Sequence, residues 1–225
     1  MKMFTQKCKV CSKKFEIEDD AMGMFRRFIV FCPLCRDEID AARRKEARES
    51  ITRERLCRWQ SMCPPIYTET VFEKLPNQDS ASKSLLWEPS AKGLMLFGKT
   101  RTGKSRVAWL ICKKAILDGL SVEILDSMAG FEYAARFSAG PESAGEWVMK
   151  KSRSGVLFFD DAFKVKLTDS FEAAIFAIVD YRMAHKLPIL ATSNDTGSTL
   201  AGRMSIDRGQ AFVARLKEMC DVIQF

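Results

Sequence analysis

GLMLFGKTRTGKSRVAWLICKKAIL, residues 93–117, is the part of the sequence that decides the fold. Its apolar run 93–97 predicts a short buried strand, and the segment 104–117 predicts a helix. Between them stands the phosphate-loop pattern GxxxxGK[ST] in its required strand-to-helix setting. The pattern is formed by Gly98, Lys99, Thr100, Arg101, Thr102, Gly103, Lys104 and Ser105.

Each part of this pattern serves phosphate binding. Successive backbone N–H groups wrap the phosphates, and the helix N-terminus adds partial positive charge. Lys104 is expected to reach the β- and γ-phosphates, while the Ser105 hydroxyl holds Mg²⁺. The stretch therefore predicts a binding site for a nucleotide with Mg²⁺.

Acidic residues close a second apolar run, VLFF at 156–159. Asp160 and Asp161 follow it, so a parallel sheet would place them at a strand's carboxyl end, beside the phosphate loop. We expect Asp160 to hold Mg²⁺ and Asp161 to orient or deprotonate the attacking water. Asn194 ends the run ATSN and could place a neutral amide near the γ-phosphate, although Ser-Asn-Asp is also an ordinary turn. Thr192 is a weaker candidate.

Strands and helices alternate from residue 93 to the end of the sequence. Further strands are expected at 121–125, 156–159 and 188–194 and in the closing DVIQF, and helices at about 131–137, 169–185 and 210–219, with an exposed loop at 138–145. Asp169 is expected to cap its helix while Glu172 reaches back to it. Alternating units of this length predict an α/β fold, a parallel sheet with helices on both faces that binds ligands beyond the carboxyl ends of its strands.

Two CxxC pairs stand near the N-terminus: Cys8 with Cys11, and Cys32 with Cys35, separated by 20 residues. This spacing is typical of a four-thiolate zinc site, which soft ligands and tetrahedral geometry favour. An iron–sulfur cluster or a redox pair is the alternative. We expect residues 1–36, with a strand-like run at 25–31, to form a zinc module that depends on metal for its folding free energy.

Positive charge is concentrated in the first quarter of the chain. The net charge is +7, and residues 1–62 hold 15 Lys and Arg against 10 Asp and Glu. Residues 37–60 predict a polar helix, so 37–63 is expected to be a basic helical linker that ends before Pro64. The excess charge favours a polyanionic or acidic partner, although a merely solvated basic surface is the plainer reading.

Composition excludes several protein classes. A chain of 225 residues with 47% hydrophobic and 29% charged residues is an ordinary globular protein, too short for a large multidomain enzyme. Neither a membrane-spanning run nor a signal peptide is apparent, so we expect a cytoplasmic protein without membrane contact.

The sequence resembles the AAA+ ATPases of the bacterial helicase-loader type, DnaC and DnaI, and the related IstB-type transposition ATPases. The resemblance covers residues 64–225 through the phosphate loop, FFDD, Asp180-Tyr181-Arg182 before LPILATSN, and the closing FVARL. DnaI-type loaders also carry an N-terminal zinc module. The resemblance implies ATP as the nucleotide, Asn194 as sensor 1, and Arg215 as an arginine finger that reaches a neighbouring subunit's nucleotide.

Two departures from the family pattern stand out. Arg101 occupies a position where the family usually has glycine, so a residue with a Cβ must adopt a backbone conformation that glycine permits, and catalysis could be slow. The sequence also ends ten residues after Arg215. We therefore expect no C-terminal helical lid, and an active site that is completed by a neighbour in a homo-oligomer formed with ATP.

The resulting expectation is an ATPase that loads a replicative helicase and contacts single-stranded DNA. An IstB-like regulator that delivers a transposase to DNA is an alternative within the same fold. A zinc-containing nucleic-acid-binding adaptor with weak turnover is another. A small-molecule P-loop kinase is disfavoured, because the sequence has no separate acceptor-binding lid.

Overall fold

The computed structural model describes residues 2–19, 29–90, 92–161, 167–195 and 197–225. The chain forms two compact units, Met1–Glu54 and Arg55–Phe225. Their boundary falls inside helix α1 (Pro33–Met62), so the last turns of this helix belong to the larger unit. Among the helices in these ranges, none combines the length and the apolar character that a membrane crossing needs.

The smaller unit begins with a hairpin of two antiparallel strands, β1 (Lys2–Lys7) and β2 (Lys14–Asp19). The turn between them carries the first cysteine pair. Of the strand expected at 25–31, residues 25–28 lie outside the described part. Residues 29–31 form no strand, so the expectation is wrong for them.

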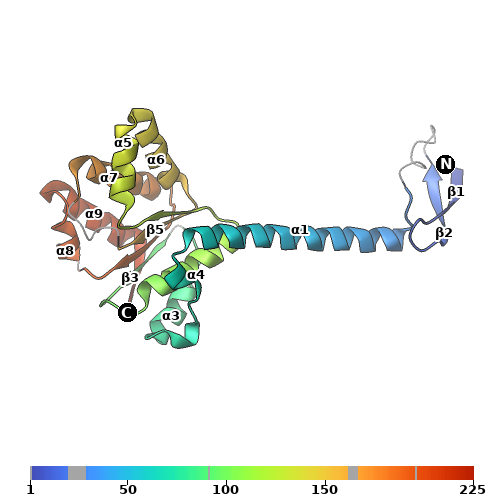
Figure 1. Ribbon diagram of the computed structural model, residues 1–225, viewed down its shortest axis with the longest axis horizontal. Helices are drawn as coiled ribbons and strands as arrows, with labels where there is room; N and C mark the ends of the chain where they lie inside the picture. Colours follow the sequence, from blue (N-terminus) through green and yellow to red (C-terminus); the bar gives the residue numbers. More distant parts are fainter. Residues whose placement is uncertain (1, 20–28, 91, 162–166, 196) are drawn as a thin grey trace. The chain divides into compact units, whose positions relative to one another are not determined.

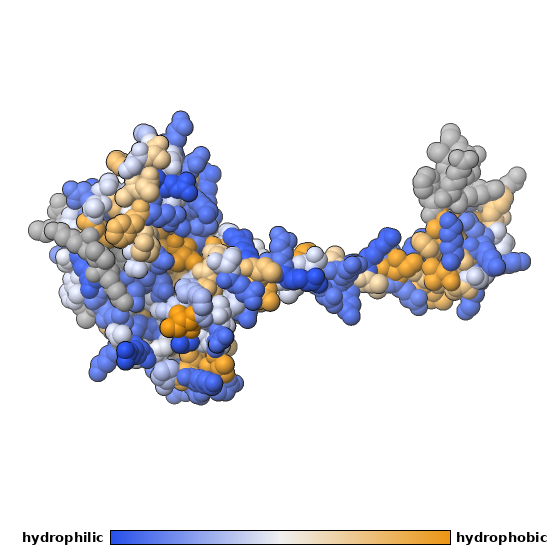
Figure 2. Space-filling view, viewed as in Figure 1, coloured by the Kyte–Doolittle hydropathy of each residue, from blue (hydrophilic) through white to orange (hydrophobic). Residues whose placement is uncertain are grey.

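Helix α1 is longer than the expected 37–60 and starts next to the second cysteine pair. All residues from 41 to 54 are exposed, and Figure 2 shows a mainly hydrophilic surface along this helix, as expected for a polar linker. Its last turns are anchored in the larger unit. Arg55 Nη1 donates to the Leu117 carbonyl at 2.6 Å, and Trp59 Nε1 donates to the Trp109 carbonyl at 3.3 Å.

The larger unit contains a five-stranded parallel sheet (Figure 1). Its strands are β3 (Gly93–Phe97), β4 (Val122–Leu125), β5 (Val156–Asp160), β6 (Ile189–Ser193) and β7 (Cys220–Gln224), in the spatial order β4-β5-β6-β3-β7. Three of them, β3, β4 and β6, lie within the stretches that the sequence predicted, whereas β5 extends one residue further, to Asp160, and β7 begins one residue earlier, at Cys220. Strand β6 separates the phosphate-loop strand β3 from the acidic strand β5, so the ends of all three strands border one site.

Helices cover both faces of this sheet, which confirms the expected layers. One face packs against α5 (Ala129–Ser138), α6 (Pro141–Arg153), α7 (Asp169–Ala184), α8 (Gly197–Ala201) and α9 (Ile206–Met219). The other packs against the end of α1, α3 (Gln78–Leu85) and α4 (Lys104–Leu117). The short helix α2 (Pro65–Thr68) and the 3₁₀ turn η2 (Phe72–Lys74) precede α3.

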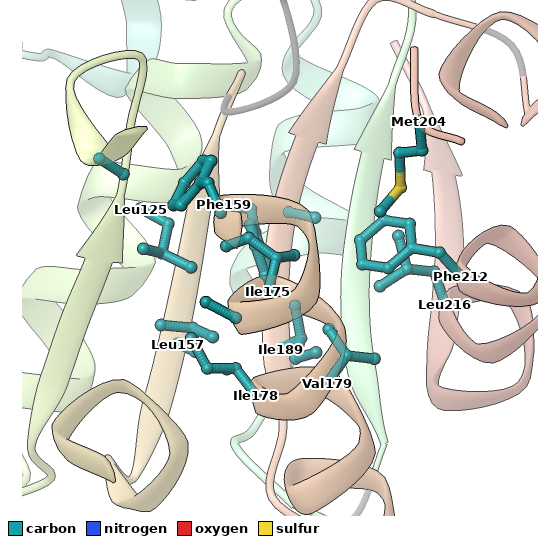
Figure 3. Close-up of a cluster of buried hydrophobic side chains, with 14 of the residues drawn as sticks. Leu125, Leu157, Phe159, Ile175, Ile178, Val179, Ile189, Met204, Phe212 and Leu216 are labelled. Atoms are coloured by element: carbon teal, nitrogen blue, oxygen red, sulfur yellow. The ribbon is translucent and has the colours of Figure 1, made fainter. Parts of the chain in front are cut away.

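The core follows the two-residue period of the strands. Leu157 and Phe159 point into the cluster beneath α7, where Ile175 and Ile178 meet them (Figure 3), whereas Phe158 packs on the opposite face. All five side chains are at most 1% exposed. Burial on both faces explains why the sequence of β5 begins with the continuous apolar run VLFF.

Three local expectations are wrong. The loop expected at 138–145 is interrupted by α6, because Pro141 occupies its first turn, where its fixed φ suits a helix and its missing N–H costs nothing. Helix α7 is capped by Thr168 rather than Asp169: the Thr168 side chain accepts from the backbone N–H of Phe171 at 3.4 Å. Helix α9 begins four residues earlier than expected.

Candidate functional site

The phosphate loop joins β3 to α4 through a backbone that uses positive φ angles at three places. Gly98 has φ 152°, and a Cβ there would lie 2.2 Å from the Phe225 carbonyl oxygen, so only glycine fits. Gly103 has φ 99° and stands before the first turn of α4. Arg101 has φ 66°, the left-handed region, at the position where the resembled family has glycine.

Lys104 lies inside the loop with only 5% of its surface exposed. Its ammonium donates to the carbonyls of Gly98 at 2.9 Å and Lys99 at 2.7 Å. Since a buried ammonium needs hydrogen-bond acceptors, these carbonyls keep its charge at the centre of the loop. The loop thus holds a fixed cation among backbone N–H groups, an arrangement suited to phosphate.

Ser105 and Asp160, the two expected magnesium ligands, lie side by side. The Ser105 hydroxyl donates to Asp160 Oδ1 at 2.8 Å. The Thr192 hydroxyl donates to the same oxygen at 2.9 Å and accepts the backbone N–H of Asp161 at 3.1 Å. Thr192 is directly opposite Asp160 in the β5–β6 register, so pairing of the strands creates this contact.

Burial raises the pKa of Asp160, the neighbouring charge of Asp161 raises it further, and the hydrogen bonds from Ser105 and Thr192 oppose this. A carboxylate in this setting gains from a nearby cation, because the cation offsets the cost of burying its charge. Hydroxyl and carboxylate oxygens are hard ligands, and together they suit Mg²⁺. The residues present therefore fit the ion that the phosphate loop implies.

A cavity of about 660 Å³ opens beside this pair. Lys104, Ser105, Asp161 and Asn194 all line it, so the structure brings these expected site residues together. The Asn194 Oδ1 atom is buried and has no hydrogen-bond partner among the described residues. A buried acceptor without a partner is costly and indicates a position for a donor such as water or a ligand group.

A further part of the cavity lining comes from the segment before α3, which no sequence pattern connects with the site. Tyr67 and Thr70 line the cavity together with Arg106 of α4. Arg106 Nη1 donates to the Ile66 carbonyl at 2.9 Å and to Thr70 Oγ1 at 3.3 Å, which ties this segment to the phosphate-loop helix. No motif marks Tyr67, and the sequence alone favours Asn194 over Thr192.

Arg215 does not line this cavity. It lies on α9, forms an ion pair with Asp180 of α7, and its guanidinium carbon is 4.4 Å from the centroid of the Phe176 ring. The structure therefore separates Arg215 from the nucleotide site of its own chain.

In the smaller unit, the four cysteines form one cluster. The Sγ atoms of Cys8, Cys11, Cys32 and Cys35 all lie within 4.8 Å of one another. Four thiolates about 2.3 Å from a tetrahedral zinc would be separated by about 3.8 Å, and the Cys11 and Cys32 sulfurs are 3.6 Å apart. The donor set fits a tetrahedral metal ion.

The thiol electrostatics agree with this fit. Burial of the Cys8 thiol acts to raise its pKa, but backbone hydrogen bonds from Cys32, Cys11 and Val10 outweigh this and lower the pKa to about 6. Contacts with the sulfurs of Cys11 and Cys32 raise the pKa of Cys35 to about 12. Neighbouring thiolates repel one another, and a divalent cation would allow all four to ionise.

Scans of the sequence against protein-family models and curated proteins gave no match. Solved structures do match. The DnaC helicase loader aligns with 72% of this chain and 99% of its own at 21% identity and TM-score 0.58, and DnaI aligns with 72% and 94% at 21% identity and TM-score 0.57. AMPPCP-bound DnaA from Aquifex aeolicus aligns with 71% of this chain at 16% identity and TM-score 0.57, over half of its own length. The chain thus has the P-loop AAA+ fold of the DnaC and DnaI helicase loaders, as its motifs predicted.

Proposed function

We propose that this protein binds ATP with Mg²⁺ and hydrolyses it. The observation that supports this best is the arrangement of Lys104 inside the phosphate loop and the Ser105–Asp160 pair beside a cavity lined by Asp161 and Asn194. The fold likeness to DnaA with bound AMPPCP adds support.

Each residue has a defined task in this proposal. Lys104 exchanges its carbonyl contacts for the β- and γ-phosphate oxygens, and Ser105 and Asp160 hold Mg²⁺, which neutralises charge that develops on the phosphates. Asp161 orients the attacking water and accepts its proton, while the unpartnered Asn194 Oδ1 accepts a hydrogen bond from that water.

Two substitutions test this proposal. Lys104→Ala should weaken ATP binding about 10- to 150-fold, because charge-assisted hydrogen bonds contribute roughly 1.5 to 3 kcal/mol. Asp161→Asn should retain ATP but lose hydrolysis. Calorimetry and a phosphate-release assay check both, with Asp195→Asn, which removes a carboxylate paired with Arg203 outside the cavity lining, as the matched control. Equal ATP affinity for wild type and Lys104→Ala would contradict the site.

We further propose that the protein is a helicase loader that acts on a replicative helicase and single-stranded DNA. The likeness to DnaC and DnaI supports the first partner, and the likeness to DnaA bound to AMPPCP and single-stranded DNA supports the second. The exposed basic residues of α1, including Arg43, Arg44, Lys45 and Arg48, offer a surface for an acidic or polyanionic partner.

Affinity capture tests the partner. Wild type and Lys104→Ala chains would be used as bait with ATP, and the retained proteins identified by mass spectrometry. A replicative helicase retained by wild type, and less by Lys104→Ala, is the expected result. A transposase in its place would instead support the IstB-like alternative, and DNA binding without either protein would support the adaptor.

A further inference from the structure

Tyr67 of α2 has no task in the proposed chemistry, yet it lines the nucleotide cavity with Lys104, Ser105 and Asp161. It precedes the phosphate loop by about thirty residues, and no motif connects the two. Its contacts show how the ring is held and which groups share the cavity with it.

The ring of Tyr67 packs against two residues of α4. It stacks on Trp109, with ring centroids 6.2 Å apart and planes inclined by 20°. The guanidinium carbon of Arg106 is 5.9 Å from the Tyr67 centroid, while Arg106 Nη1 also ties down the Ile66 carbonyl and the Thr70 hydroxyl on either side. Trp109 is itself 2% exposed and meets Phe158 edge-on. The position of Tyr67 is therefore fixed relative to the phosphate-loop helix.

Tyr67 shares the cavity with Ser105 and Asp161, and its stacking partner Trp109 stands one turn after Ser105 on α4. Burial raises the pKa of Tyr67, the charges of Asp160 and Asp161 raise it further, and an interaction with the Ser105 side chain opposes them. Ser105 in turn donates to Asp160, so the expected magnesium ligands form the polar surroundings of Tyr67 in this cavity. A phenol is a neutral hydrogen-bond donor and acceptor at physiological pH, so it can contact hydroxyl, carboxylate or phosphate oxygens without adding charge.

We propose that Tyr67 is a positioning residue of the Mg²⁺–nucleotide site, whose hydroxyl orders Ser105 and the Asp160–Asp161 pair for Mg²⁺. This inference rests on the proposed ATP–Mg²⁺ site and adds the segment before α3 to it. Tyr67 acts through the ligands rather than on the phosphates. The Mg²⁺ dependence of nucleotide binding should therefore change when the hydroxyl is removed, whereas binding without Mg²⁺ should not.

Tyr67→Phe isolates this contribution, because it keeps the ring on Trp109 and removes only the hydroxyl. Affinity for the non-hydrolysable analogue AMPPCP would be measured by calorimetry in EDTA and across a series of Mg²⁺ concentrations. We expect the Kd for AMPPCP in EDTA to be unchanged. The Mg²⁺ concentration that gives half of the maximal gain in AMPPCP affinity should rise about three- to tenfold, which is the effect of losing one hydrogen bond. Tyr181→Phe is the matched control, since Tyr181 of α7 stacks on His185 and does not line the cavity.

The outcomes separate this inference from the site on which it depends. Wild-type Mg²⁺ dependence in Tyr67→Phe overturns the inference alone. If wild type binds AMPPCP no better with Mg²⁺ than with EDTA, the proposed site itself is wrong and the inference falls with it. Tyr67→Leu, which also removes the stack on Trp109, should weaken binding in EDTA too. If Tyr67→Phe also weakens binding in EDTA, the hydroxyl acts on the nucleotide directly rather than through the Mg²⁺ ligands, and the inference is overturned.

Discussion

At the scale of single residues, Arg101 carries a conformational cost within the phosphate loop. Its φ of 66° lies in the left-handed region, which disfavours residues with a Cβ by roughly 1 to 2 kcal/mol. The loop closes nonetheless, because the Lys104 ammonium draws the Gly98 and Lys99 carbonyls together. The phosphate loop thus combines the strained backbone of Arg101 with the buried cation of Lys104.

Replacing Arg101 by glycine should therefore leave stability unchanged or raise it, since relief of strain offsets the greater freedom of glycine in the unfolded chain. Lys99→Gly is the matched control: Lys99 belongs to the same loop, is exposed and does not have a positive φ. Lys99→Gly should lower the free energy of unfolding by about 0.5 to 1 kcal/mol. In a melting experiment this corresponds to a Tm lower by about 2 to 4 °C per kcal/mol. Calorimetric melting of both variants checks this, and a larger loss in Arg101→Gly than in Lys99→Gly would contradict it.

The sequence predicted the site residues that belong to a motif and missed those that tertiary structure supplies. Lys104 and Ser105 could be predicted because they occupy fixed positions in the phosphate-loop pattern. Asp160 could be predicted because it directly follows an apolar strand. Thr192 gained its importance only from strand register, which places it opposite Asp160. Tyr67 reaches the cavity through stacking on Trp109, a contact between segments about forty residues apart that no local pattern encodes.

At the scale of secondary-structure elements, the strands were the easiest to predict and the helix ends the hardest. Continuous apolar runs mark strands that are buried on both faces, as in β3, β5 and β6, whereas the edge strands β4 and β7 also carry the polar residues Glu123 and Asp221. Helix ends depend on contacts that periodicity does not show. Glu172, expected to complete the cap of α7, instead accepts hydrogen bonds from the backbone and hydroxyl of Ser205, at 2.8 and 2.6 Å, just before α9.

The hairpin of the smaller unit has few apolar residues to stabilise it. In the described part of the smaller unit, the buried apolar side chains are three of the cysteines and Ile17, with Phe15 and Phe31 packed against the cysteines. So small a core supplies little folding free energy, and the four cysteines would then stabilise the hairpin through a shared metal ion. We propose zinc as that ion.

Elemental analysis should find one zinc per chain, and chelation should unfold the hairpin while leaving ATP binding largely intact, because the two units have separate cores. A variant with Cys32→Ser and Cys35→Ser should lose the metal. Cys57→Ser, which removes an exposed cysteine outside the cluster, should keep it. Equal zinc content in both variants would refute the site. If the analysis finds iron and inorganic sulfide instead of zinc, the four cysteines hold an iron–sulfur cluster.

At the scale of the whole molecule, the position of Arg215 bears on how copies of the chain could work together. Arg215 is held on α9 by Asp180 and Phe176, both on α7, with a side chain that is 29% exposed. It lines no part of its own nucleotide cavity. We propose that it acts in trans, leaving Asp180 to stabilise charge at the γ-phosphate of a neighbouring subunit. An ordinary surface ion pair would have no such effect.

Mixing two inactive chains separates these possibilities. Arg215→Ala and Asp161→Asn should each lack hydrolysis alone but recover part of it together, because some interfaces then join an intact Asp161 site to an intact Arg215. Specific activity of wild type should also rise with protein concentration. Arg208→Ala, on the same helix, should remain active, since its guanidinium contacts only the Asp169 carbonyl, at 3.5 Å, among the described residues. Two results would contradict this proposal: normal hydrolysis by Arg215→Ala alone, or an inactive mixture of variants that are shown to co-assemble in analytical ultracentrifugation. Arg215 would then form only a structural ion pair, and an active site completed by a neighbour would need a different residue.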